Sequence, residues 1–250
     1  MKLEQTNRII IKIGSALLFN ETSGSLNKEW LNSLAEDVKY LRENDKEVII
    51  VSSGAIAMGA KDLDLDMKNM KMDMNQAVSA VGQIHLMGSF KSAFEKNEIK
   101  ISQILLTLDD TEQRRRSINA RRTIDTLLKL GIVPVVNEND TIATSEIRYG
   151  DNDRLASRVA QITSADCLIL LSNINGLYSA DPSTDEDVKL INKVSEIDKD
   201  IEKMIGQSIS DYGKGGMKTK IQAAKTAMLS GCHLAITCLL YTSDAADDLW

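Results

Sequence analysis

Cysteine and histidine are scarce in this sequence, which contains 3 cysteines and 2 histidines among 250 residues. The cysteines Cys167, Cys232 and Cys238 form no C-x-x-C pair, and they do not alternate with the histidines at a spacing typical of zinc sites. Cys167 opens the apolar run 167–171, so we expect a buried structural thiol there. A zinc site or a cysteine nucleophile is therefore not expected.

Long apolar runs and an excess of positive charge are absent as well. No run approaches the roughly 20 apolar residues that a membrane-spanning helix needs, and the polar segment 1–8 does not resemble a signal peptide. The net charge of −6 argues against nucleic acid as the main partner. We therefore expect a cytoplasmic protein with no nucleic-acid or membrane partner, in which a few local cations would form any phosphate site.

The distribution of apolar residues predicts alternating strands and helices. Short apolar runs predict strands at 9–13, 48–51, 101–106, 132–136, 168–171 and 234–236. Several of them are apolar at consecutive positions, as in strands buried on both faces of a parallel sheet. A spacing of three or four residues predicts helices over 26–41, 74–94 and 217–228. This order indicates a doubly wound α/β fold, in which ligands bind beyond the carboxyl ends of the strands.

Two charged stretches, residues 61–73 and 181–200, are expected to form surface loops or lids. Methionines cluster in and just after the first stretch, and we expect them to fill irregular gaps in the core. They are Met67, Met70, Met72 and Met74.

The first candidate phosphate site lies where a predicted strand ends in Lys12 and turns through Gly14 and Ser15. Glycine lets backbone N–H groups approach an anion closely, and the lysine adds a positive charge. The same residues are compatible with a solvated lysine followed by a tight turn, so this segment alone does not decide between the two interpretations.

A second strand-to-helix turn lies at residues 51–61 and is similar to a Walker A loop. It departs from that motif because Lys61 comes one place late and no serine or threonine follows it. Ser52 and Ser53 precede the helix, whose N-terminus could bind a substrate carboxylate. Alternatively, one of the serines simply caps the helix.

Amides and carboxylates cluster in two segments, 136–140 and 150–153, that flank one loop. Turns and helix caps favour Asn and Asp, so either segment alone has an ordinary structural explanation. Together the two segments offer groups that could bind the ammonium and carboxylate groups of a small polar ligand.

The segment 213–220 opens the last predicted helix and contains three lysines, Lys214, Lys218 and Lys220. Backbone amides, the helix dipole and these lysines would converge on one end, a combination that favours phosphate binding. An exposed basic start of a helix is the alternative.

In this order, these segments resemble the amino acid kinase family, and within it the members that phosphorylate free glutamate. The resemblance covers roughly residues 8 to 237, with matching text at 11–15, 53–57, 137–140, 150–153, 176–182 and 215–220. It implies an amino acid kinase domain over residues 1–237, an αβα sandwich around a mostly parallel sheet. Many members append a PUA domain, for which this chain has no room. Residues 238–250 are an atypical tail that we expect to be non-native.

The resemblance implies a reaction and its participants. ATP with Mg²⁺ would phosphorylate the γ-carboxylate of L-glutamate to L-glutamyl 5-phosphate, the first step of proline biosynthesis. It further implies a homo-oligomer, proline as a feedback inhibitor, and a functional link to glutamate-5-semialdehyde dehydrogenase. Two alternatives stay open: a sister kinase acting on N-acetylglutamate or another small carboxylate, and a non-catalytic sensor of amino acids or ATP.

The resemblance also implies roles for individual residues, and it leaves the ligands of Mg²⁺ unassigned. Lys12 and Lys220 would flank the ATP phosphates, and Asp153 would hold both lysines. Glutamate would be bound by Ser53, Asn137, Asp140 and Asn152. The nucleotide would be bound by Lys12, Gly14, Ser15, Ser172, Asn173, Lys214, Gly215, Gly216, Met217, Lys218, Thr219 and Lys220.

Two of these segments depart from the family pattern, which usually has Thr-Asp in place of Ser172-Asn173 and threonine in place of Lys214. Both departures keep polar groups near the nucleotide, so they affect the expected ATP affinity more than the reaction.

Overall fold

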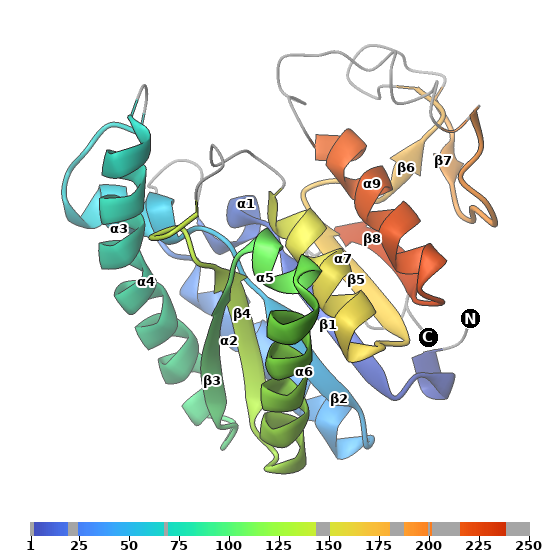
Figure 1. Cartoon of the computed structure of the whole chain (residues 1–250), viewed down its shortest axis with the longest axis horizontal. Coiled ribbons are helices and arrows are strands. Elements are labelled where there is room, and N and C mark those ends of the chain that lie inside the picture. The colour runs from blue at the N-terminus through green and yellow to red at the C-terminus, as the bar shows by residue number, and fades with distance from the viewer. Residues whose placement is uncertain are drawn as a thin grey trace.

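The computed structural model describes residues 3–19, 25–67, 70–143, 151–180, 188–199, 201 and 216–238. A six-stranded sheet lies at its centre (Figure 1). In spatial order its strands are β3 (Ile101–Leu106), β4 (Val133–Glu138), β2 (Glu47–Val51), β1 (Arg8–Ile13), β5 (Cys167–Ser172) and β8 (His233–Cys238). Every neighbouring pair in this sheet is parallel. All six predicted strands are therefore confirmed, as is the mostly parallel sheet.

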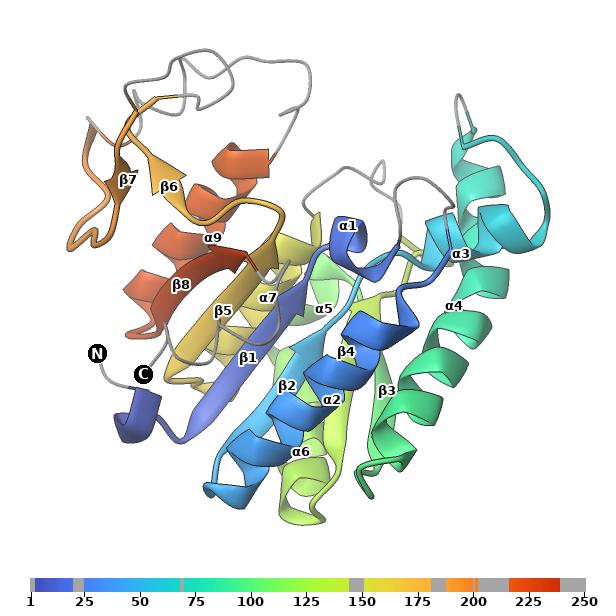
Figure 2. The ribbon, with the colours of Figure 1, turned by 180° about the vertical axis from the view of Figure 1, so that it is seen from behind.

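Helices cover both faces of the sheet, which gives three layers (Figures 1 and 2). One face packs against α1 (Ser15–Leu18), α2 (Lys28–Glu43) and α4 (Met72–Glu95). The other packs against α6 (Arg114–Lys129), α7 (Asp151–Thr163) and α9 (Gly216–Leu229). Within β1, Ile9 and Ile11 belong to the first core and Ile10 to the second. Both faces of the strand are buried, which explains why apolar residues fill consecutive positions.

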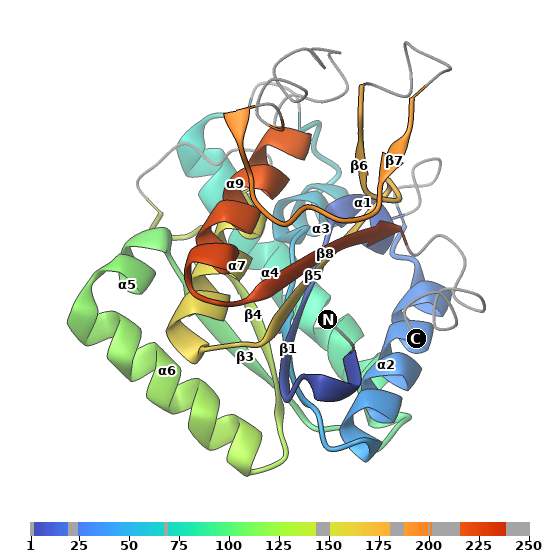
Figure 3. The same cartoon turned by 90° about the vertical axis from the view of Figure 1, so that its right-hand side faces the viewer.

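Three short helices and a small second sheet complete the described elements. They are η1 (Leu3–Gln5), α3 (Ala55–Asp62), α5 (Leu108–Glu112), and the antiparallel pair β6 (Leu177–Tyr178) and β7 (Leu190–Ile191). Figure 3 shows β6 and β7 beyond the carboxyl end of β8, apart from the main sheet. None of the helices in the described ranges is long and apolar enough to span a membrane.

Helices α3 and α4 touch through their backbones, because glycine occupies the contact on both sides. A Cβ atom on Gly82 would lie 1.8 Å from the Ala55 carbonyl oxygen and 2.4 Å from the Gly59 nitrogen. A Cβ atom on Gly59 would lie 1.9 Å from the carbonyl oxygen of Val78. No side chain fits between the two helices there, so this contact fixes the position of α4 relative to the turn that follows β2.

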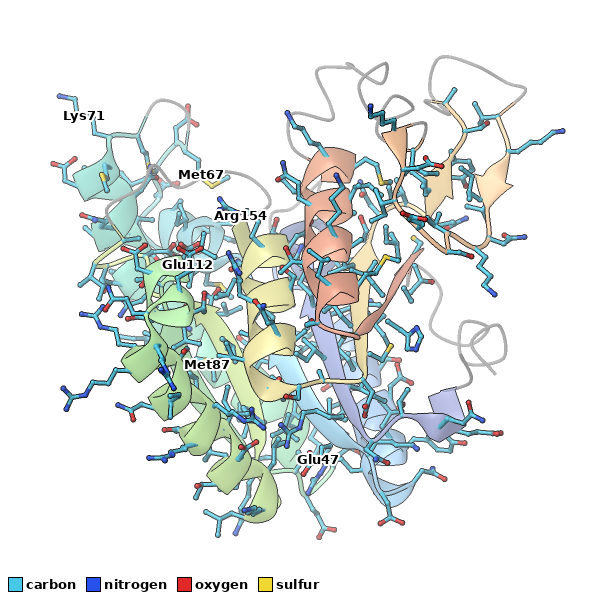
Figure 4. The ribbon with its side chains drawn as sticks, turned by 45° about the vertical axis from the view of Figure 1, so that its right-hand side comes forward. Glu47, Met67, Lys71, Met87, Glu112 and Arg154 are labelled. Carbon is cyan, nitrogen blue, oxygen red and sulfur yellow. The ribbon has the colours of Figure 1, made fainter. Side chains whose placement is uncertain are left out.

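The expectation that the methionine cluster fills core gaps is wrong for three of its members. Met67 is 51%, Met72 37% and Met74 47% exposed. Figure 4 shows Met67, after α3, and Lys71, just before α4, at the outer edge of the molecule. Within the predicted lid at 181–200, residues 188–199 contain β7, and the remainder lies outside the described residues. Residues 239–250, most of the expected tail, also lie outside them.

Candidate active site

Parallel strands bring the separate sequence motifs to one edge of the sheet. Lys12 lies near the carboxyl end of β1, Ser53 follows β2, Asn137 lies near the end of β4, and Ser172 ends β5. Figure 4 shows Arg154, in the first turn of α7, at the end of the molecule opposite Glu47, where β2 begins. The candidate site therefore lies at the carboxyl ends of the strands, as the predicted fold class requires.

Asp153 joins the two lysines that were predicted to flank a phosphate. One of its carboxylate oxygens lies 2.6 Å from Lys12 Nζ, and the other lies 3.0 Å from Lys220 Nζ. All three side chains are buried, with Asp153 1%, Lys12 6% and Lys220 7% exposed. Thr219 Oγ1 also donates to Asp153, at 3.1 Å. We call Lys12, Asp153 and Lys220 the charged triad.

Burial and the oppositely charged neighbours act in opposite directions on the pKa values of Lys12 and Asp153. Burial lowers the pKa of Lys12 and the nearby Lys220 ammonium lowers it too, while Asp153 opposes both effects. Burial alone would raise the pKa of Asp153, but the ammonium groups of Lys12 and Lys220 outweigh it and hold that pKa below 3.8. With both lysines protonated, one carboxylate neutralises only one of two ammonium groups. The remaining positive charge, in a buried site of an acidic protein, favours an anionic ligand.

A chain of three amides lies next to the triad. Asn152, adjacent in sequence to Asp153, donates from Nδ2 to Asn137 Oδ1 at 3.4 Å. Asn137 in turn donates from Nδ2 to Gln83 Oε1 at 2.7 Å. Two predicted substrate residues thus contact each other, and α4 supplies the third amide.

A second side chain of α4 contacts Asp140, another of the predicted substrate residues. Ser79 Oγ donates to Asp140 Oδ2 at 2.6 Å, and both side chains are buried. Sequence reasoning missed Ser79 and Gln83. The sequence pattern that could have indicated them is two polar residues four positions apart on the buried face of an apolar helix. A polar side chain in such a place needs a hydrogen-bond partner.

A pocket of about 260 Å³ opens beside these side chains. Its polar lining includes the carboxylates of Glu138 and Asp140, each only 8% exposed, together with Ser79, Gln83 and Gln103. Two carboxylates in a nearly buried wall favour a cationic group such as an ammonium.

Ser53 has a different partner from the other predicted substrate residues. Its Oγ donates to the carbonyl oxygen of Ile13 at 2.9 Å, which links the end of β2 to the end of β1. Gly54, not a serine, caps α3, with φ +94°, and no side chain bonds to that helix end. The alternative in which a serine caps the helix is therefore wrong.

The predicted nucleotide residues that are described lie around the ends of β1 and β5. Gly14 precedes α1, and its N–H donates to the Leu171 carbonyl oxygen at 3.3 Å. Ser15 is the first residue of α1. Ser172 is buried at the end of β5 and Asn173 beside it is exposed, with 3.3 Å between Ser172 Oγ and Asn173 Oδ1.

The remaining predicted nucleotide residues belong to the start of α9. Gly216, Met217 and Lys218 form its first turn, ahead of the two residues that contact Asp153. Lys214 and Gly215 lie outside the described residues, as does the predicted turn residue Gly150.

Metal ligands and reactive thiols do not form a cluster in the described ranges. Among those residues, no group of three or more His, Cys, Asp or Glu side chains could hold a metal ion. Cys167 is buried, as predicted, and burial raises the pKa of its thiol to about 12.

A three-layer α/β fold that places two buried lysines on one carboxylate at its strand ends is suited to binding a phosphorylated ligand. The model of the amino acid kinase family matches residues 7–238, and the chain belongs to that family.

Curated relatives include the glutamate 5-kinase of Pelagibacter ubique, which is 58% identical over 94% of this chain. The glutamate 5-kinase of Ruegeria sp. is 52% identical over 94% of this chain. In both cases this chain spans 64% of the relative's length.

Two solved structures share the fold at low sequence identity. UMP kinase from Ureaplasma parvum gives a TM-score of 0.64 at 16% identity, covering 98% of this chain and 96% of that one. Isopentenyl phosphate kinase from T. acidophilum gives a TM-score of 0.66 at 14% identity, covering 97% and 95%. At these identities the likeness concerns the fold alone, and it agrees with the predicted αβα sandwich.

Proposed function

We propose that this chain is the kinase domain, over residues 1–237, of a glutamate 5-kinase. It transfers the γ-phosphoryl group of ATP to the γ-carboxylate of L-glutamate, which gives L-glutamyl 5-phosphate and ADP in the first step of proline biosynthesis. The observation that carries the proposal is the charged triad, which lies beside an amide chain and a carboxylate-lined pocket. The names of the curated relatives support the choice of substrate.

The triad suits phosphoryl transfer because this reaction depends on positioning and charge rather than on covalent chemistry. A γ-carboxylate oxygen of glutamate forms a bond to the γ-phosphorus as the bond to the bridging oxygen of ADP breaks. Lys12 and Lys220 stabilise the negative charge that spreads over the transferred group. The nucleophile is already ionised at neutral pH, so no general base is needed. Alignment of the two reactants accounts for about 7–11 kcal/mol of the barrier at most.

The other predicted residues divide between the two substrates. Asp140 would accept the α-ammonium group of glutamate, and Asn137, Asn152 and Ser53 would complete that site. The nucleotide would lie along the segments at Gly14–Ser15 and Ser172–Asn173 and along residues 214–220, the last five of which begin α9. Asp153 is occupied by both lysines, so Mg²⁺ would be held by ATP oxygens and water, an arrangement that this ion often adopts.

Three further features rest on the resemblance and the relatives' names, and they stay proposals. The protein would be a homo-oligomer, proline would inhibit it, and its reactive product would pass to glutamate-5-semialdehyde dehydrogenase. A cytoplasmic location would suit these substrates.

The test is ATP consumption with L-glutamate in the presence of hydroxylamine, which traps an acyl phosphate as a hydroxamate. We expect hydroxamate that depends on both substrates. Lys12→Ala and Lys220→Ala should each lower kcat by about 10²–10³-fold, since each removes a group that meets the transferred charge. Lys39→Ala, at an exposed position of α2, is the matched control and should keep wild-type turnover.

Other outcomes of the same assay favour the alternatives. Turnover with N-acetylglutamate but not with glutamate would indicate the sister kinase, because an acylated amine gives Asp140 no ammonium partner. A folded, ATP-binding protein that forms no hydroxamate with any small carboxylate would indicate a sensor. Wild-type turnover in Lys12→Ala or Lys220→Ala would refute the role given to that lysine.

A further inference from the structure

Gln83 occupies the far end of the amide chain and has an unused hydrogen-bond donor. Its side chain accepts from Asn137 through Oε1, at 2.7 Å. Its Nε2 is buried and has no hydrogen-bond partner among the described residues. The whole residue is 8% exposed and lines the 260 Å³ pocket. A buried donor without a partner is costly, so an acceptor that pairs with it on binding gains affinity.

The direction of the amide chain determines what each end can bind. Because Asn137 donates to Gln83 and accepts from Asn152, Gln83 presents a donor and Asn152 presents an acceptor. The Asn152 Oδ1 atom is likewise buried without a partner in the described part of the chain. The chain of amides therefore has a donor at the pocket end and an acceptor at the end next to Asp153.

Three links separate Gln83 from the charged triad, through Asn137, Asn152 and the neighbouring Asp153. In the proposed reaction the γ-carboxylate of glutamate must meet the triad, so the far end of the substrate meets the pocket. That end bears an α-ammonium and an α-carboxylate on one carbon atom. The pocket offers a complementary partner for each group, since Asp140 and Glu138 supply carboxylates for the ammonium and Gln83 supplies a hydrogen-bond donor for the carboxylate.

We infer that Gln83 is a specificity-determining residue that donates from Nε2 to the α-carboxylate of the acceptor substrate, while its Oε1 fixes the amide of Asn137. This inference rests on the proposed function. It predicts selectivity for α-amino acids over amines that carry the same distal carboxylate. Ser79, one turn earlier on α4, holds Asp140 in the orientation that receives the α-ammonium group.

The test compares two acceptor substrates in the hydroxamate assay: L-glutamate and 4-aminobutyrate, which lacks only the α-carboxylate. The Gln83→Glu variant keeps the acceptor for Asn137 but loses the donor and adds a negative charge. The Gln83→Met variant loses both functions at similar volume. The ratio of kcat/KM for the two substrates, measured on one sample, is independent of the folded fraction, so partial unfolding does not disturb it.

We expect both variants to lower the ratio of glutamate to 4-aminobutyrate kcat/KM by about 10- to 100-fold, as befits a hydrogen bond to a charged group. The KM for ATP should stay within about twofold of wild type. Gln222→Glu, the same change at an exposed position of α9, should leave the ratio unchanged.

Each contrary result has a separate meaning. An unchanged ratio in both variants, with wild type active on glutamate, would overturn the inference and leave the proposed function intact. If only Gln83→Met lowered the ratio, the role of Gln83 would be to position Asn137 through the hydrogen bond to its Oε1. That result would overturn the donor role. Wild-type protein that forms no glutamate-dependent hydroxamate would overturn the proposed function itself, and with it this inference.

Discussion

Replacement of Asp153 by asparagine would leave two buried ammonium groups without the carboxylate that both of them contact. The new side chain has nearly the same shape, so the packing at this 1% exposed position is preserved. The change removes the one negative charge that contacts Lys12 and Lys220, which are 6% and 7% exposed. Asp153→Asn therefore tests the electrostatics of the site with little disturbance of its volume.

Loss of one partner from a buried ion pair typically costs about 3–5 kcal/mol, because the remaining charge stays buried without compensation. We expect a loss of about that size in the free energy of unfolding at neutral pH. The loss should depend on pH. The pKa of Asp153 lies below 3.8 in the folded protein, so its contribution to stability is full above the unfolded value. That contribution disappears as the pH falls through the folded pKa.

At alkaline pH the difference between variant and wild type should also shrink. Asp153 raises the pKa of Lys12 against the effect of burial, so its removal lets Lys12 lose its proton at a lower pH. A neutral amine is cheaper to bury than an ammonium group. The penalty therefore fades as the pH rises toward the ordinary lysine value of 10.5.

Urea denaturation followed by far-UV circular dichroism measures this difference, with Asp109→Asn as the matched control. Asp109 is exposed on α5, so its replacement should change the free energy of unfolding by no more than about 0.5 kcal/mol. A loss below about 1 kcal/mol for Asp153→Asn at neutral pH would refute the description of the triad as three buried charges. A loss independent of pH would assign the effect to packing instead.

Two other predictions follow from the packing of the fold. Gly82→Ala should lower the free energy of unfolding by about 1–3 kcal/mol, since its Cβ would lie 1.8 Å from a backbone oxygen of α3. Gly88→Ala on the same helix would meet nothing within 4 Å, so it should raise the free energy of unfolding by about 0.5–1 kcal/mol. Thermal or urea unfolding compares them, and equal effects would contradict the close helix contact. Burial raises the pKa of the Cys167 and Cys232 thiols to about 12, so at mildly alkaline pH only Cys238 should react with a thiol reagent before unfolding. Reaction of more than one thiol per native chain would contradict that burial.

The sheet was predictable from sequence mainly because strands such as β2 and β5 are apolar at consecutive positions, a pattern typical of strands buried on both faces. Helix α6 was not predicted, since Ile124 is its one fully buried side chain and arginines fill much of its surface. With so few apolar residues on its buried face, α6 shows little of the three- to four-residue apolar periodicity by which a helix is predicted from sequence. Helix α4 was predicted from its apolar positions, yet the same pattern concealed Ser79 and Gln83 among them.

Part of the site was predictable from sequence, but contacts between residues that lie far apart in the sequence were not. Lys12 and Lys220 could be selected because lysine beside glycine suits phosphate, and the family resemblance assigned Asp153 to them. The contact between Ser79 and Asp140 spans 61 residues, and that between Gln83 and Asn137 spans 54. Local patterns cannot show such contacts, because they depend on where α4 lies relative to β4.

The three members of the charged triad come from β1, α7 and α9, and this has a consequence during synthesis on the ribosome. Asp153 precedes Lys220 by 67 residues, so the carboxylate and the first lysine leave the exit tunnel well before the second lysine does. In a partial chain that has folded up to α7, Asp153 would face Lys12 alone, and this pair would carry no net charge. A nascent or prematurely terminated chain would thus attract nucleotide weakly, and ATP capture would begin only when the domain is nearly complete.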